Sequence, residues 1–209
     1  MNAPAAPPNR HASDLSSSVT GTGKRQQHKL ATLNALRQAA LDLALTHGLD
    51  TITVGDIAKR SAVSRRTFFN YFASKEDAVV GETPELVGMV HTTIVERPDS
   101  EQPLVAVRNA LVELAATIVT PQMRQRIRNR HQLLTAHPEL LGRHLARYAA
   151  FENLLREAIS DRGSEDPDLL ATVVTSTLRL CVQRWATDDG VDLVHHLEQS
   201  LSAIHNGLR

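Results

Sequence analysis

Hydrophobic residues recur at three- and four-residue intervals through most of this 209-residue chain, a spacing typical of amphipathic helices. The segment from Lys24 to Thr46 contains no glycine or proline, and His47-Gly48 closes it in the way that helices commonly end. No stretch alternates polar and apolar residues for long enough to indicate a strand. The pattern therefore predicts an all-α fold with roughly nine helices.

Several shorter helices are predicted after this first one. Thr53, Ser64 and Ser74 are suited to be N-caps, because a side-chain hydroxyl can accept a hydrogen bond from an amide of the first turn. Thr120-Pro121 and Asp166-Pro167 resemble an N-cap followed by proline at the first helical position. The predicted helices after the first cover about 54–61, 64–72, 75 onward, 85–96, 102–119, 122–136, 139–161, 168–187 and 191–206.

The charged residues are unevenly distributed. Lysine and arginine together number 23, as do aspartate and glutamate, so the formal net charge is zero. Residues 1–75 nevertheless hold ten basic and four acidic residues, whereas residues 76–209 hold thirteen arginines and nineteen acidic residues. A basic N-terminal part on an acidic remainder suggests that only the former meets a polyanion, although chance segregation would give the same counts.

Composition divides the chain into three parts. Residues 1–23 are rich in Ala, Pro, Ser, Thr and Gly and offer little to bury, so we expect a disordered arm there. Residues 24–75 hold the long helix and the short helices that follow it, and they form the candidate DNA-binding domain. Residues 76–209 are long enough to form a helical domain with a core of its own.

Several classes of protein are disfavoured. No run of about 18 apolar residues exists and residues 1–26 lack an apolar segment, so we predict neither a transmembrane helix nor a signal peptide. The single cysteine, Cys181, excludes an internal disulfide and fits a reducing cytoplasm. No metal-ligand spacing, glycine-rich phosphate loop or nucleophile motif is present, so we expect no metal, no cofactor and no catalysis. A helical enzyme with an unrecognised active site is the alternative.

Four of the seven aromatic residues lie within five positions, at 68, 69, 71 and 72. Phe68 and Phe72 are four residues apart and share one helical face, where they can pack with Ile57 and Val63. Ala58 supplies the small residue that two steeply crossing short helices need where they touch. The other faces carry side chains that suit base edges in a DNA major groove, and these are Arg65, Arg66, Thr67, Phe69 and Asn70.

This region resembles the helix-turn-helix of TetR-type transcriptional regulators. The matching residues are Thr53, Ile57-Ala58, Ser61-Ala62-Val63-Ser64, Thr67, Phe69, Tyr71-Phe72 and Lys75-Glu76. The resemblance implies that Thr53 and the amides beginning the second helix hold a DNA phosphate, while Tyr71 and Lys75 contact the backbone. The residues that it places against the bases are Arg65, Arg66, Thr67, Phe69 and Asn70. It also implies that Lys24 and Arg25 of the arm reach phosphates or the minor groove.

Two positions depart from the family pattern. Ala62 replaces the usual turn glycine, which costs on the order of 1 kcal/mol if this position has a positive φ. Phe69 replaces a common tyrosine, which removes one hydroxyl from the DNA-facing side. A basic amphipathic hairpin without a DNA role is the alternative to this interpretation.

A regulator of this type needs a partner subunit, because a single helix-turn-helix reads too few base pairs. Residues 168–187 carry apolar side chains most of the way round the predicted helix, and residues 191–206 carry an apolar stripe. A helix that is apolar on more than one face has two surfaces to cover. We therefore expect these two helices to form a homodimer interface, with a fully internal helix as the alternative.

Residues 124–190 resemble the C-terminal domain of mycofactocin-regulator-like TetR proteins. The matching phrases are Arg-x-Arg-x-x-Leu-Leu, His137-Pro138-Glu139-Leu140 and the segment 180–185. The resemblance implies a sensor of fatty acyl thioesters or other lipophilic metabolites.

Four arginines share one predicted helix in this region, at 124, 126, 128 and 130. Helical spacing places Arg124 and Arg130 beside an apolar stripe that includes His131, so Arg130 and His131 are candidate contacts for an anionic ligand. A solvated or salt-bridged arginine face and a core histidine are the alternatives.

Taken together, these features predict a TetR-type transcriptional regulator. The specific expectation is a cytoplasmic homodimeric repressor that a small hydrophobic or acyl-type ligand releases from a palindromic DNA operator. The alternative is a DNA-binding protein without ligand control, which would not require so long an acidic body.

Overall fold

The computed structural model describes residues 14–81 and 84–207, which form helices joined by turns and loops, with no strand among them. The elements are α1 (Asp14–His47), α2 (Val54–Arg60), α3 (Arg65–Phe69), α4 (Lys75–Val80), α5 (Pro84–Val95), α6 (Pro103–Ile118), α7 (Pro121–Ala136), the 3-10 turn η1 (Pro138–Leu140), α8 (Leu141–Asp161), α9 (Pro167–Thr187) and α10 (Leu193–His205). The predicted all-α fold is confirmed, and the helices expected beyond residue 84 agree with the observed ones to within two residues.

The predicted N-caps are confirmed by hydrogen bonds. Thr53, Ser64 and Ser74 accept from the amides of the third residues of α2, α3 and α4. Thr120 and Asp166 cap α7 and α9 in the same way, each followed by proline at the first helical position. The start of each of these helices is therefore determined by a local side chain.

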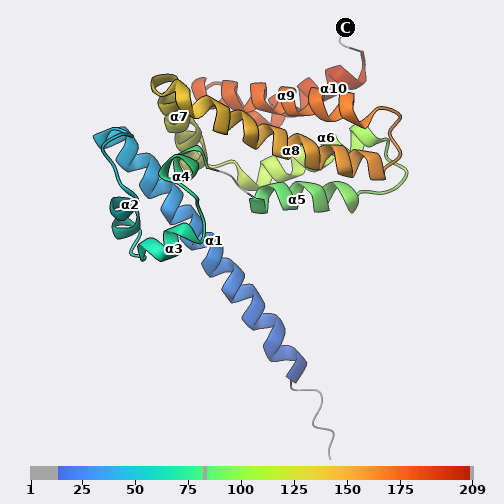
Figure 1. Cartoon of the computed structure of the whole chain (residues 1–209). Coiled ribbons are helices and arrows are strands. Elements are labelled where there is room, and N and C mark those ends of the chain that lie inside the picture. Colours follow the sequence, from blue (N-terminus) through green and yellow to red (C-terminus); the bar gives the residue numbers. More distant parts are fainter. Residues whose placement is uncertain (1–13, 82–83, 208–209) are drawn as a thin grey trace, which may run out of the picture.

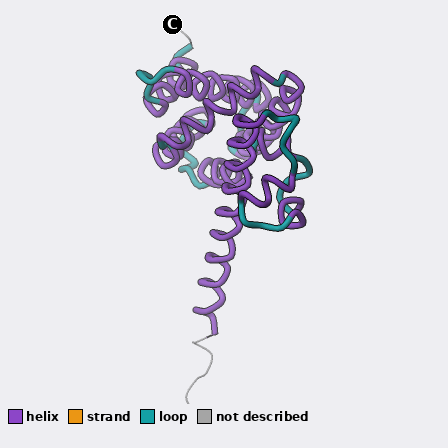
Figure 2. Tube along the Cα trace, turned by 90° about the vertical axis from the view of Figure 1, so that its left-hand side faces the viewer, coloured by secondary structure: helices purple, strands orange, loops and turns teal. Residues whose placement is uncertain are grey.

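Helix α1 begins ten residues earlier than its predicted start at Lys24. Residues 14–23 are helical, so the expectation of a disordered arm is wrong for them, and residues 1–13 lie outside the described residues. Extending an existing helix needs no new nucleus, so a helix can continue through residues of low propensity such as Gly21 and Gly23. This end of α1 projects away from the rest of the molecule (Figure 1; Figure 2).

The remainder of α1 packs with α2, α3 and α4, and we call residues 14–81 the head. Its core is built around Leu36, Ile57 and Phe68, none of which exposes any surface. Phe72 is also buried, with its ring centroid 5.6 Å from that of Phe68, as their spacing predicted. Ala58 is buried in α2 beside them, so the short helices pack closely on α1.

Helices α5 to α10 form a second helical group, which we call the body, residues 84–207 (Figure 1). Trp185, Leu155 and Ile159 lie at its centre and are almost fully buried. Helix α10 turns its leucine stripe inward, so that Leu197 and Leu201 are covered by α6 and α9. The stripe predicted for this helix therefore serves the core of the subunit itself.

No single helix in the described ranges is long and apolar enough to cross a membrane. The bent pair α6 and α7 would meet that requirement by length and composition only.

Helix α7 connects the two groups. At its beginning, Met123 and Ile127 pack against the body core. Near its end, Leu133 is buried in the head core together with Leu140 of η1. The head is therefore fixed to the body by apolar contacts as well as by the chain, and movements of α7 can reach both.

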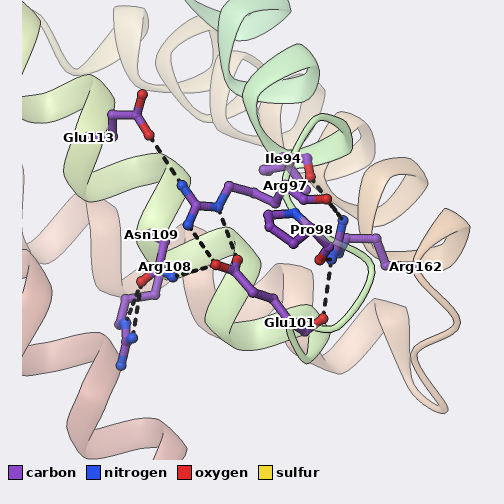
Figure 3. A network of polar contacts seen from close by, with 8 residues as sticks. All are labelled: Ile94, Arg97, Pro98, Glu101, Arg108, Asn109, Glu113 and Arg162. Carbon is purple, nitrogen blue, oxygen red and sulfur yellow. Dashed lines mark hydrogen bonds and ion pairs between the residues drawn. The ribbon is translucent and has the colours of Figure 1, made fainter.

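A polar network holds the connection between α5 and α6 at the far end of the body (Figure 3). The guanidinium of Arg162, just after α8, donates to four main-chain carbonyl oxygens, those of Ile94, Arg97, Pro98 and Glu101. Arg97 also pairs with Glu101, with Nη2 2.6 Å from Oε1, and with Glu113. The Ile94 and Pro98 carbonyls also accept main-chain amides of the turn, whereas those of Arg97 and Glu101 are satisfied by Arg162.

Candidate nucleic-acid interface

The N-terminus of α2 is stabilised by a reciprocal capping box. The amide of Asp56 donates to Thr53 Oγ1 over 3.2 Å, and the Asp56 carboxylate accepts from the Thr53 amide over 2.9 Å. The Thr53 hydroxyl also donates to that carboxylate over 2.6 Å. These bonds hold the pKa of Asp56 below its usual value. Thr53 is exposed, as its predicted phosphate contact requires, but its hydroxyl proton is engaged by Asp56.

The turn between α2 and α3 confirms the expected strain at Ala62. This residue has a φ of 54°, in the left-handed region that glycine adopts without penalty. Its amide donates to the Lys59 carbonyl over 3.2 Å, and the Val63 amide donates to the Ala58 carbonyl over 3.0 Å. These bonds end α2 and set the direction of α3.

Helix α3 buries one face and exposes the other. Phe68 is fully buried, whereas Arg65, Arg66 and Asn70 are exposed and Thr67 is half-buried. Phe69 is 55 % exposed, although its ring meets that of Phe68 edge-on with centroids 5.5 Å apart. Among the described residues, no carboxylate pairs with either arginine. An exposed face with two unpaired cations, an amide and a phenyl ring has the groups that contact base edges and thymine methyls.

Lys75, at the beginning of α4, is engaged within the head. Its Nζ donates to the carbonyl oxygens of Leu49, Asp50 and Ile52 over 2.8, 3.3 and 3.0 Å. An ammonium group has three hydrogens, so these contacts occupy all of them. This geometry suits the positioning of α4 against the end of α1 better than the backbone contact expected of Lys75.

The other predicted backbone contacts lie at the edges of this surface. Tyr71 is half-buried and packs against the head core. Lys24 and Arg25 belong to α1, but their side chains lie outside the described residues.

The four arginines of α7 form two pairs that point in opposite directions. Residues two apart on a helix are separated by about 200°. Arg124 and Arg128 reach the end of α9, where both pair with Asp189 and hold its pKa below the usual value. Arg126 instead donates to Gln38 of α1 over 3.3 Å, and Arg130 donates to the Val80 carbonyl of α4 over 3.3 Å. One pair therefore contacts the body and the other contacts the head.

Arg130 and His131 differ in their surroundings from the prediction. His131 is exposed, so its expected place on the buried stripe is wrong, as is the alternative of a core histidine. The reason is that α7 leaves the body core after Ile127, and Leu133 then enters the head core. Arg130 is half-buried where head and body meet, close to Arg147 of α8.

Two pockets lie on helices that could transmit a ligand's effect. One of about 430 Å³ lies between head and body, lined by Lys29, Leu33, Arg37, Asn70, Tyr71, Phe72, Ala73, Asp77, Val80 and Arg143. Another of about 400 Å³ is lined by Val119, Thr120, Pro121, Arg124, Gln125, Arg128, Trp185 and Asp189. In the second, the Arg124 guanidinium lies 5.0 Å from the centroid of the Trp185 ring.

Sequence reasoning missed Arg37 and Arg147 as members of the junction between head and body. Arg37 is only 6 % exposed, although it is charged. Its burial could have been predicted from the sequence. Arg37 follows Leu33 by four residues and precedes Ala40 by three, so it lies on the buried stripe of α1. Arg147 offered no comparable pattern, since its partner, the carbonyl of Gly81, is distant in sequence.

These features define a helix-turn-helix DNA-binding protein with a helical C-terminal domain, and comparison with known proteins identifies the family. The model of the MftR C-terminal domain matches residues 101–209, and the model of the bacterial regulatory proteins of the tetR family matches residues 36–79. The chain belongs to the TetR family of transcriptional regulators, with a C-terminal domain of the MftR type.

Two curated relatives span most of the chain. MftR of Mycobacterium tuberculosis, a regulator proposed for mycofactocin biosynthesis, is 25 % identical over 87 % of this chain and 93 % of its own length. The HTH-type transcriptional regulator TcmR of Streptomyces glaucescens is 27 % identical over 85 % of this chain and 83 % of its own.

Solved structures share the fold. The fatty acid degradation regulator FadR of Bacillus halodurans matches with a TM-score of 0.59 and 22 % identity, over 85 % of this chain and 96 % of that one. FadR of Thermus thermophilus, a TetR-family repressor crystallised with lauroyl-CoA, matches with a TM-score of 0.51 and 22 % identity, over 85 % of this chain and 95 % of that one.

Proposed function

We propose that this regulator is a homodimeric repressor that binds a palindromic DNA operator and leaves it when a small hydrophobic or acyl-type ligand binds the body. The observation that carries the proposal is the exposed face of α3, with Arg65, Arg66, Phe69 and Asn70 pointing away from the head core. Thr67 lies at the edge of that face. Contacts from Thr53, Tyr71 and the arm residues Lys24 and Arg25 would add phosphate binding.

The dimer interface is proposed for α8 and α9. Four large apolar side chains on these adjacent helices, Leu141, Leu145, Leu169 and Leu180, are between 45 % and 61 % exposed. Exposed apolar side chains on two neighbouring helices are typical of an interface. The sequence suggested α9 with α10, but α10 buries its leucine stripe within the subunit, so α8 takes its place in the proposal.

The effector class is proposed from the relatives and from the junction between head and body. The neighbour from Thermus thermophilus binds lauroyl-CoA. In this chain, Arg130 lies where the body meets α4, so an anionic group bound there would act directly on the head. The exposed His131 contributes no wall to an enclosed site, and we leave it out of the proposed ligand contacts.

The DNA-binding proposal is tested with duplexes that the protein itself selects from a random pool. We expect Arg65→Ala/Arg66→Ala to lose the preference for the selected duplex over a scrambled one, since each good base contact contributes about 1–3 kcal/mol of discrimination. The matched control is Lys59→Ala/Arg60→Ala, which removes the same charge from α2. The control should keep the preference for the selected duplex, because Lys59 and Arg60 lie in the last turn of α2, outside the proposed base-contacting face of α3.

The proposal fails if the double variant of α3 keeps the full preference, or if no sequence is enriched from the pool. Ligand control is tested separately by adding lauroyl-CoA or lauric acid to the preformed complex. A complex that neither compound weakens would support DNA binding without control by acyl ligands.

A further inference from the structure

Three arginines from three different helices converge on the end of α4. Arg147 of α8 donates to the Gly81 carbonyl over 3.2 Å, and Arg130 of α7 donates to the Val80 carbonyl over 3.3 Å. Arg37 of α1 passes beside them, because a Cβ placed on Gly81 would lie 3.8 Å from both Arg37 Nε and Arg130 Nη1. We call Arg37, Arg130 and Arg147 the junction arginines.

The junction is electrostatically unfavourable for cations. Burial, followed by the neighbouring Arg147, Arg126 and Arg37, lowers the pKa of Arg130 to about 9, so it stays charged at neutral pH. Burial and the nearby Arg147, Arg130 and Arg179 lower the pKa of His144 to about 4, so this imidazole is neutral. Its buried Nδ1 has no hydrogen-bond partner among the described residues. Like charges held this close repel unless an anion compensates them.

The acidic groups of the described junction are used elsewhere. Asp77 pairs with Arg143, and Asp42 pairs with Arg60. Within the described ranges, Arg130 and Arg147 hydrogen-bond to main-chain carbonyls alone, with one bond each. A guanidinium has five N–H donors, so each of these two keeps most of its donors for another acceptor.

A cavity lies beside Arg37, one of the junction arginines, and Arg130 and Arg147 are not among the residues that line it. The pocket of about 430 Å³ between head and body has Arg37 and Val80 in its wall, and Lys29 adds a further cation, while Arg143 lies there paired with Asp77. Its volume is sufficient for a phosphoryl or diphosphate group. Guanidinium groups bind such oxyanions through two parallel hydrogen bonds, which makes arginine well suited to this chemistry.

We propose that the junction arginines bind a diphosphate group of the effector and that this binding releases α4 from the body. The inference deepens the proposed function and rests on it. The anion competes with the Val80 and Gly81 carbonyls for Arg130 and Arg147, so it favours arrangements in which the head is free to move. Ligand binding then changes operator affinity because the ligand prefers one arrangement over the other.

The diphosphate can belong to a coenzyme A thioester or be free inorganic pyrophosphate, and titration calorimetry separates the two. The full chain is titrated with sodium pyrophosphate, coenzyme A and lauroyl-CoA. In Arg130→Gln/Arg147→Gln we expect every ligand that binds the wild type to bind about 10-fold more weakly or worse. The matched control is Arg156→Gln, which removes a cation from α8 that pairs with Asp168. It should leave ligand affinity unchanged.

Two further variants guard against loss of folding in the double variant. Arg130→Lys and Arg147→Lys keep the charge but lose the planar fork, so they should hold the fold and still weaken ligand binding. Circular dichroism and the thermal midpoint check the fold. Binding of lauroyl-CoA alone would assign the site to acyl thioesters, whereas equal binding of pyrophosphate would assign it to free anions.

The inference is overturned if the wild type binds none of the three ligands, if the junction variants bind as tightly as the wild type, or if Arg156→Gln weakens binding as much. Measuring release of the bound duplex distinguishes failure of this inference from failure of the proposed function. The selected duplex should be released from the wild type by the ligand but stay bound to Arg130→Gln/Arg147→Gln. If the variant complex is released as readily, only this inference fails, whereas failure to select any duplex counts against DNA binding itself.

Discussion

Phe69 offers a quantitative test of the DNA-facing surface. A phenylalanine side chain has roughly 200 Å² of surface, and Phe69 is 55 % exposed, which leaves roughly 100 Å² available to DNA. At about 25 cal/mol per Å², its complete burial contributes about 2.5 kcal/mol per subunit as an upper limit. Phe69→Ala should therefore weaken operator binding by about 10- to 70-fold per subunit.

Fluorescence anisotropy with the selected duplex measures this loss. Phe69→Tyr should retain most of the affinity, since it keeps the ring and adds a hydroxyl. Met89→Ala is the matched control, because Met89 is 48 % exposed on α5 and lies outside the proposed interface. If Phe69→Ala binds the duplex as tightly as Met89→Ala does while both remain folded, the assignment of this face to DNA is refuted.

Further substitutions test the strain, the loop network and the dimer. Ala62→Gly should raise the free energy of unfolding, measured by urea titration, by up to about 1 kcal/mol, since it relieves the positive φ. Ala116→Gly, at an exposed position of α6, should lower that free energy by about the same amount. Arg162→Ala should lower it by about 2–3 kcal/mol, because it leaves the carbonyl groups of Arg97 and Glu101 without a donor, and an unchanged thermal midpoint would contradict the role of that network. Leu145→Glu/Leu180→Glu should raise the dimer dissociation constant by at least about 30-fold, and a variant that stays dimeric in light scattering at low concentration would place the interface elsewhere.

Local rules account for most of what the sequence could predict about the fold. Helix starts followed from capping side chains such as Thr53, whose hydrogen bond acts within one turn. The head core followed from spacing, since Phe68 and Phe72 are one turn apart and both are buried. The family motif predicted which residues lie on α3, and the structure shows why its outer face is free.

The errors arise where the environment of a residue is set by distant parts of the chain. His131 has the spacing of a core residue, but α7 leaves one core for another at that point. For Lys75, whose contact with the DNA backbone stays a prediction, spacing did not reveal that its ammonium meets carbonyls of a loop more than twenty residues earlier. The junction arginines belong to three helices whose proximity no periodicity reveals. For α10, an amphipathic stripe indicated burial but could not show whether its own subunit or a partner covers it.

Footprinting of the protein on its selected duplex tests the central claim most directly, because the claim is that two copies of α3 read two half-sites. Hydroxyl-radical cleavage should show two related protected half-sites in inverted orientation, centred about one helical turn or a multiple of it apart. Arg65→Ala/Arg66→Ala should remove this pattern at protein concentrations that still give nonspecific binding. Protection of a single, non-repeated site, or an unchanged footprint with that variant, would contradict the account.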